Sequence, residues 1–135
     1  MSRSLTAPPL GGNTIGSGED GLVVAEWQDP GGPVGERRLI APPHLHHHDD
    51  EIWYVLEGTL CVQSGDQEIE APAGAAVRVP RGTPHTYWNP GPERCRYLLV
   101  MTSRIYRLIQ AIHAATDRSP AALKELFRKY DSELL

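Results

Sequence analysis

The stretch PPHLHHHDDEIWYVLEG, residues 42–58, carries the pattern on which the fold and the site depend. It packs four histidines and three acidic residues into positions 44–51, with only Leu45 between them. Side chains two apart in a β-strand point to the same face about 6–7 Å apart, so His44 and His46 are expected to share a face. Glu51 opens the next apolar run after a gap long enough for a turn. Two imidazoles and one carboxylate that converge are typical of a divalent metal site with open coordination positions.

The remaining polar residues of this stretch are interpreted differently. Residues 47–50, HHDD, are expected to form a solvated turn between two strands, where they could gate a pocket mouth or tune its charge. A further histidine, His85, follows a PRGTP turn and opens the run HTYW. A lone histidine there would by itself more often be a packed or surface residue, and His113 is interpreted that way.

Composition excludes several classes of protein. The chain has 135 residues, of which 40% are apolar and 22% charged, which favours one globular domain. The net charge of −4 and the lack of a basic patch argue against a nucleic-acid partner. No run of eighteen apolar residues and no apolar leader are present, so we predict a cytoplasmic protein without a membrane partner. The two cysteines, Cys61 and Cys95, are expected to be buried thiols.

Eight short runs predict β-strands, separated by turn clusters such as DPGGP, SGD and PRGTP. The predicted strands cover residues 22–27, 35–41, 52–57, 60–64, 67–71, 76–80, 85–89 and 94–101. Short strands at nearly even spacing, with no helix between them, favour an antiparallel sandwich or barrel.

The two ends of the chain differ from this pattern. Apolar residues at 105, 108, 109 and 112 predict a helix, and Ser119-Pro120 opens a second one with its own apolar stripe. Both short helices are expected to pack on the outside of the β body. Residues 1–20 are rich in Gly, Ser and Pro and are expected to form a flexible arm that is mobile or draped over the rest.

Two matched motifs show that the chain resembles the cupin superfamily. The first motif, H-x-H-x(3,4)-E-x6-G, is met by His44, His46, Glu51 and Gly58. The second, G-x5-P-x-G-x2-H-x3-N, is met by Gly74, Pro80, Gly82, His85 and Asn89. Arg38 stands where the family's first motif usually opens with a glycine, which affects only the local turn.

The resemblance implies an all-β fold, a cupin jelly-roll β-barrel (an antiparallel double-stranded β-helix) over residues 21–101. The two short C-terminal α-helices would form an extension, residues 102–135, packed on the barrel within a single domain. The resemblance also implies that His44, His46, Glu51 and His85 hold one divalent transition metal ion inside, either Fe, Mn, Ni, Cu or Zn. Gly58, Gly74 and Gly82 would lie at turns that need positive φ or close backbone approach.

Three functions follow from such a site. Resemblance to quercetin dioxygenase-like cupins implies dioxygenase-like chemistry on a small phenolic or enolisable molecule, with Glu51 as the catalytic group that accepts a proton. Alternatively, the metal acts as a Lewis acid in a non-redox isomerase, cyclase or lyase. The third alternative is a non-catalytic cupin that binds a small molecule.

Alternation from Glu51 and His85 directs Trp53, Val55 and Tyr87 inward. These three residues would line a substrate pocket or form ordinary core, and the sequence leaves both interpretations open. A homodimer is also expected, because small cupins commonly pair through a sheet face or an exchanged N-terminal strand.

Overall fold

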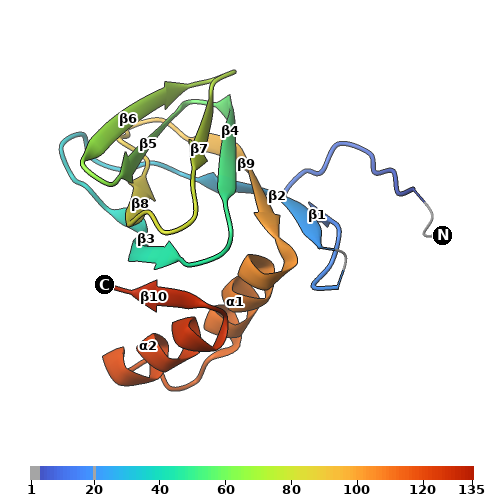
Figure 1. Ribbon diagram of the computed structural model, residues 1–135. Coiled ribbons are helices and arrows are strands. Elements are labelled where there is room, and N and C mark those ends of the chain that lie inside the picture. The colour runs from blue at the N-terminus through green and yellow to red at the C-terminus, as the bar shows by residue number, and fades with distance from the viewer. Residues whose placement is uncertain (1–3, 20) are drawn as a thin grey trace.

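Two five-stranded antiparallel sheets pack face to face in the computed structural model, which describes residues 4–19 and 21–135 (Figure 1). The first sheet has the order β1 (Thr14–Ile15), β2 (Leu22–Asp29), β9 (Cys95–Thr102), β4 (Glu51–Glu57) and β7 (Ala76–Val79). The second has the order β10 (Ser132–Leu134), β3 (Leu39–His46), β8 (His85–Trp88), β5 (Thr59–Ser64) and β6 (Gln67–Pro72). The jelly-roll arrangement predicted from the motifs is confirmed as two antiparallel sheets.

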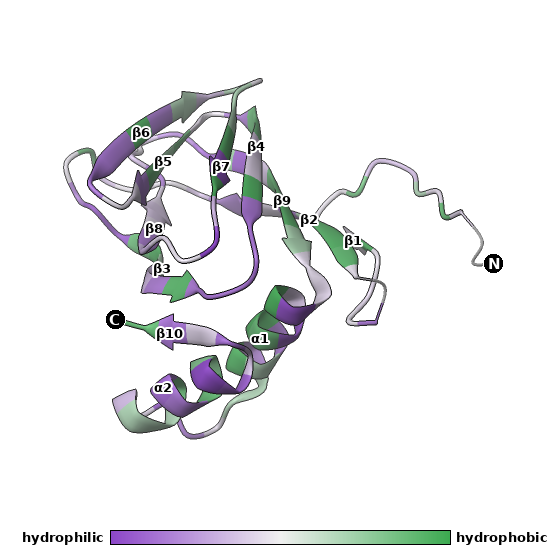
Figure 2. Cartoon of the chain, in the orientation of Figure 1, coloured by the Kyte–Doolittle hydropathy of each residue, from purple (hydrophilic) through white to green (hydrophobic). Residues whose placement is uncertain are grey.

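Strict alternation of buried and exposed side chains builds the core between the sheets. On β4, Trp53 and Val55 are fully buried while Ile52 and Tyr54 are exposed on the outer face. On β9, every second residue from Cys95 to Met101 is buried, and this strand is coloured largely apolar in Figure 2. Burying each large apolar side chain is worth about 1.5–3 kcal/mol, so this two-residue period determines which face each strand turns inward.

The predicted strand over 35–41 is the least accurate of the eight, because β3 runs from Leu39 to His46. Pro42 and Pro43 lie inside it and cannot donate ladder hydrogen bonds. The strand tolerates them because its pairing with β8 shifts register between Ala41 and His44. The other seven strands lie within two residues of their predicted ends, and the two shortest strands, β1 and β10, were not predicted.

The three motif glycines lie at tight turns and have positive φ angles. Gly58, between β4 and β5, has φ 75°, and a Cβ there would collide with the carbonyl oxygen of Arg94. Gly74 and Gly82 also have positive φ, at 88° and 77°. The motif glycines are therefore required by the backbone, as expected. Cys61 and Cys95 are buried free thiols, which confirms their interpretation.

Two helices follow the last long strand and lie below the sheets in Figure 1. Helix α1 spans Ser103–Ala114, and the hydroxyl of Thr102 accepts a hydrogen bond from the backbone N–H of Ile105 at its start. Helix α2 spans Pro120–Lys129 and begins at the predicted Ser119-Pro120 pair. Neither helix in the described part of the chain has the length and apolar run that crossing a membrane requires. After α2 the chain returns as β10 to pair with β3.

The predicted arm over 1–20 includes residues 1–3 and 20, which lie outside the described residues. Within the arm, Thr14–Ile15 forms β1 and pairs with Val24 and Ala25 of β2. This part of the arm is therefore attached to the edge of the first sheet.

Candidate metal centre

Four buried side chains converge between the two sheets. His44 and His46 come from the end of β3, Glu51 from the start of β4, and His85 from the start of β8. One ligand atom from each lies within 4.8 Å of the others. Pairing of β3 with β8 places His44 directly opposite His85, and the two-residue period brings His46 to the same face. The structure thus brings together all four residues implied by the motifs.

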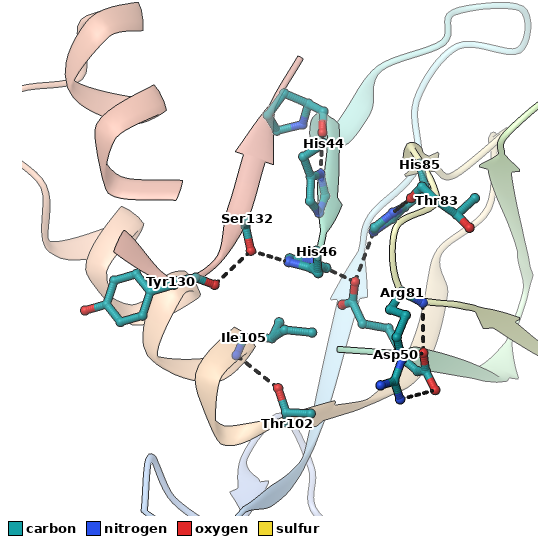
Figure 3. A network of polar contacts seen from close by, with 12 residues as sticks. His44, His46, Asp50, Arg81, Thr83, His85, Thr102, Ile105, Tyr130 and Ser132 are labelled. Atoms are coloured by element: carbon teal, nitrogen blue, oxygen red, sulfur yellow. Dashed lines mark hydrogen bonds and ion pairs between the residues drawn. The ribbon is translucent and has the colours of Figure 1, made fainter. Parts of the chain in front are cut away.

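Backbone carbonyls determine which nitrogen of two of these histidines faces the centre. Nδ1 of His44 lies 2.6 Å from the carbonyl oxygen of Pro42, and Nδ1 of His85 lies 2.9 Å from that of Thr83 (Figure 3). A carbonyl oxygen only accepts hydrogen bonds, so each Nδ1 carries the proton. The Nε2 lone pair of each ring is therefore free to bind a metal.

A side chain from β10, the C-terminal strand, determines which nitrogen of His46 faces the centre. Nδ1 of His46 lies 2.6 Å from the hydroxyl oxygen of Ser132. This hydroxyl donates its own hydrogen to the carbonyl oxygen of Tyr130, 3.1 Å away (Figure 3). The hydroxyl oxygen is thus left to accept from His46, which is the orienting contact that metal-ligating histidines usually make.

The centre of the cluster contains acceptors without donors. Nε2 of His46 and Nε2 of His85 lie 2.9 and 3.0 Å from the same oxygen, Oε1 of Glu51. With both Nδ1 atoms protonated, these three atoms face one another as lone pairs, an arrangement that a cation between them stabilises. Three imidazole nitrogens and one carboxylate are also a suitable donor set for a first-row divalent metal. The residues therefore fit a metal ion.

The protonation states of two ligands agree with this assignment. Burial, followed by the nearby His85 and His46, lowers the pKa of His44 to about 4, so its imidazole is neutral at pH 7. Burial raises the pKa of Glu51, but hydrogen bonds and charge from His46 and His85 outweigh that effect and lower the pKa to about 2. In the metal-free chain a proton in this cluster therefore lies between a ring nitrogen and the carboxylate, in the place that a metal ion would take. A neutral imidazole and an ionised carboxylate are the forms that bind metals.

A cavity of about 600 Å³ opens from this cluster toward the helices. His44, His46 and Glu51 lie at its inner end, and Tyr87 is among its lining residues. Trp53 and Val55 point inward but lie in the core and do not line the cavity. Trp53 packs instead against the back of the cluster, with its ring centroid 5.8 Å from that of His85.

The two helices form one wall of the cavity, a role that was not predicted from the sequence. Ile105, Leu108, Ile109 and Ile112 line the cavity, with Phe127 of α2 beside them. The helical period of these α1 residues is the pattern from which the helix was expected to pack on the outside of the β body. The stripe was visible in the sequence, but nothing local showed that it faces the site rather than solid core. His113 lies at the exposed end of this wall.

The loop over residues 47–50 only partly matches the expected solvated turn. Asp49 is buried, with its Oδ2 3.6 Å from Nε of Arg104, so the expectation of full solvation is wrong there. Asp50 accepts hydrogen bonds from Arg81 and Arg78, and these contacts hold its pKa far below the usual range. Among the described residues, the converging group contains none of these four positions.

Fold and cluster together define a double-stranded β-helix protein with a candidate metal centre between its two sheets. Residues 33–101 match the family model described as Cupin domain, which is half of the chain, and the chain belongs to the cupin family.

Known proteins are similar to parts of the chain. It is 34% identical over 79 residues to mannose-1-phosphate guanylyltransferase RfbM of Salmonella typhimurium, covering 58% of this chain and 15% of that protein. The chain spans less than half the length of the first curated relatives that it matches.

Two solved structures agree in fold. An uncharacterized protein with a double-stranded β-helix domain from Klebsiella pneumoniae has a TM-score of 0.55 at 22% identity, covering 73% of this chain and 78% of that one. A cupin-superfamily sugar phosphate isomerase from Silicibacter pomeroyi has a TM-score of 0.52 at 21% identity, covering 61% and 50%.

Proposed function

We propose that this chain binds one divalent transition metal ion through His44, His46, Glu51 and His85 and uses it to transform a small organic molecule by dioxygenase-like chemistry. One observation carries the proposal: three Nε2 lone pairs and a carboxylate converge within 4.8 Å of one another at the inner end of a cavity. Two histidines and one carboxylate with open positions are the donor arrangement of non-haem iron oxygenases, and this chain adds a third histidine to that set.

The bound ion would supply open coordination positions for the substrate oxygen and dioxygen. The protein would supply the remaining functions. Glu51 is a carboxylate that lines the cavity beside the other ligands, and in this proposal it accepts the proton that a phenol or enol loses on binding to the ion. The buried imidazoles remain fixed by their Nδ1 contacts. Apolar side chains around the inner end exclude water from the reacting groups.

Metal analysis tests the first half of the proposal. The purified chain should hold about one divalent ion, and the paired substitution His44→Ala/His46→Ala should remove most of it. His47→Ala/His48→Ala is the matched control, because it changes two histidines of the neighbouring loop, of which His47 is half-exposed. Full metal content in the first variant would contradict the assigned ligands.

Oxygen uptake tests the second half. An iron-loaded chain should consume dioxygen with a phenolic or enolisable substrate, and a zinc-loaded chain should not. Turnover by the zinc form without dioxygen would instead favour the Lewis-acid alternative. Ligand binding without turnover in either form would favour a non-catalytic cupin.

Names of similar proteins suggest a second candidate. RfbM is named for a sugar phosphate substrate, and the Silicibacter pomeroyi protein for sugar phosphate isomerisation. A Lewis-acid isomerase of a phosphorylated sugar is therefore the non-redox form of the proposal. The predicted homodimer and cytoplasmic location remain predictions.

A further inference from the structure

The walls of the cavity differ sharply from its inner end. On the helix side they include Ile105, Leu108, Ile109 and Ile112, four aliphatic side chains of α1, with Phe127 of α2 beside them. The facing sheets contribute further apolar residues, among them Trp27, Ile40 and Leu99. A ligand that reaches the metal ligands must therefore lie along apolar surface for most of its length.

Apart from the proposed metal ion, the lining residues that carry a full charge are acidic. In the part of the chain that the structure describes, no lysine or arginine lines the cavity, and its acidic lining residues are Glu26 and Glu51. Arg96 neighbours Glu26 on the sheet, with Nε 3.6 Å from its carboxylate. Arg96 does not itself line the cavity, and Glu26 and Glu57 both engage it, so it is not free to pair with an anion inside.

An anionic ligand would be poorly matched to these walls. A phosphate group is strongly hydrated, and burying it along walls that offer it no lysine or arginine is costly. Sugar hydroxyls beside the isoleucines of α1 would lose hydrogen bonds to water without replacement. The apolar part of a ligand has no hydrogen bonds to water to lose, and its burial against these walls lowers the free energy of binding.

Polar side chains are few among the lining residues: besides the groups at the two ends, Glu26, Trp27, Tyr87 and Tyr97 carry polar atoms. The inner end holds the candidate metal ligands, while Gln28 and His113 lie at the exposed end with Gly11 and Gly12. The volume of about 600 Å³ lies in the usual range for sites that enclose a whole small organic molecule.

We propose that this cavity takes an uncharged, largely apolar small molecule with a metal-coordinating oxygen at its inner end, and that it discriminates against phosphorylated ligands. The proposal rests on the proposed function for the inner end and deepens it by naming the ligand class. It selects the phenolic or enolisable class over the phosphorylated sugar.

Calorimetric titration with two probes tests the ligand class. Zinc-loaded protein is titrated with 2-naphthol, an apolar ring system with one hydroxyl oxygen, and separately with ribose 5-phosphate. We expect 2-naphthol to bind at least about tenfold more tightly, because only its body matches the apolar walls. Equal or tighter binding of ribose 5-phosphate, or no binding of 2-naphthol, would overturn the proposal.

Substitutions on α1 locate the binding. Ile109→Asp places a charge on the cavity wall and should weaken 2-naphthol binding at least about tenfold. Gln110→Asp, on the exposed face of the same helix, should change it less than about twofold. If Ile109→Asp does not fold, Ile112→Trp, which fills part of the cavity, should give the same loss. Unchanged binding in the folded variant would contradict the assigned cavity.

Zinc content, measured before titration, separates this proposal from the previous one. A chain that takes up no zinc contradicts the proposed function. The same titrations on metal-free protein then decide the ligand class, because the apolar walls still predict a preference for 2-naphthol.

Discussion

The hydroxyl oxygen of Ser132 lies 2.6 Å from Nδ1 of His46, although 86 positions of sequence separate the two residues. The contact exists because β10 pairs with β3 and places Ser132 directly opposite His46. The C-terminal strand thus orients a ligand of the candidate metal centre.

Ser132→Ala should weaken metal binding. Without the hydroxyl, Nδ1 of His46 has no protein acceptor and the ring can turn, so we expect a loss of about 10–100-fold in affinity. Competition with a coloured chelator measures it. Ser119→Ala is the matched control, because it removes the N-cap of α2 and should cost about 1 kcal/mol of stability with no change in metal affinity. Equal affinities in the two variants would rule out the orienting role.

Acid should destabilise the metal-free protein through His44. The unfolded chain takes up a proton near the ordinary pKa of 6.5, whereas folded His44 does so only near 4. Between these values acid favours the unfolded chain, so stability is full above 6.5 and falls by about 3 kcal/mol toward pH 4. Glu51, with its lowered pKa of about 2, contributes only below its ordinary value of 4.5. Urea unfolding across this pH range measures the slope, and His44→Gln should flatten it.

Arg104→Ala should destabilise the fold more than loss of an ordinary surface arginine. Arg104 lies 3.6 Å from the buried Asp49 and 2.7 Å from Asp131. Its removal leaves the Asp49 carboxylate buried without a cation, at a cost of about 1–3 kcal/mol. Arg128→Ala, which breaks an exposed pair with Glu125, should cost less than about 0.5 kcal/mol. Thermal unfolding of both variants without metal compares them, and equal melting temperatures would contradict the prediction.

Two glycines form a matched pair for backbone strain. Gly58→Ala adds a Cβ that meets the carbonyl oxygen of Arg94, whereas a Cβ at Gly74 meets open space. Both have positive φ. Gly74→Ala should therefore cost about 1 kcal/mol from conformation alone, and Gly58→Ala clearly more, about 2–4 kcal/mol. Chemical denaturation measures both, and a smaller loss at Gly58 would show that the turn can relax.

Local sequence patterns predicted the parts of the fold that depend on local chemistry. Alternation on β4 placed Glu51 and Trp53 on one face, and motif spacing selected His85 from the remaining histidines. Ser119-Pro120 marked the start of a helix, because cap chemistry acts within one turn.

The remaining features depend on contacts between distant segments. Pro42 and Pro43 disguised the strand that carries two ligands, since their place at a register shift depends on β8. Ser132 lies in a strand too short to give a periodic signal. Burial of Asp49 depends on the fold around it, including α1, and the aliphatic stripe of α1 has the same period whether it faces a cavity or a filled core.

The position of Trp53 supplies an intrinsic fluorophore for the metal centre. Its indole is fully buried and its ring centroid lies 5.8 Å from that of the ligand His85. Open-shell ions such as Cu(II) quench indole emission at short range, whereas closed-shell Zn(II) does not. Trp27 and Trp88 also emit, so a Trp27→Phe/Trp88→Phe variant is needed to isolate Trp53. In that variant, emission from Trp53 can report both the filling of the site and the electronic class of the ion, without any label.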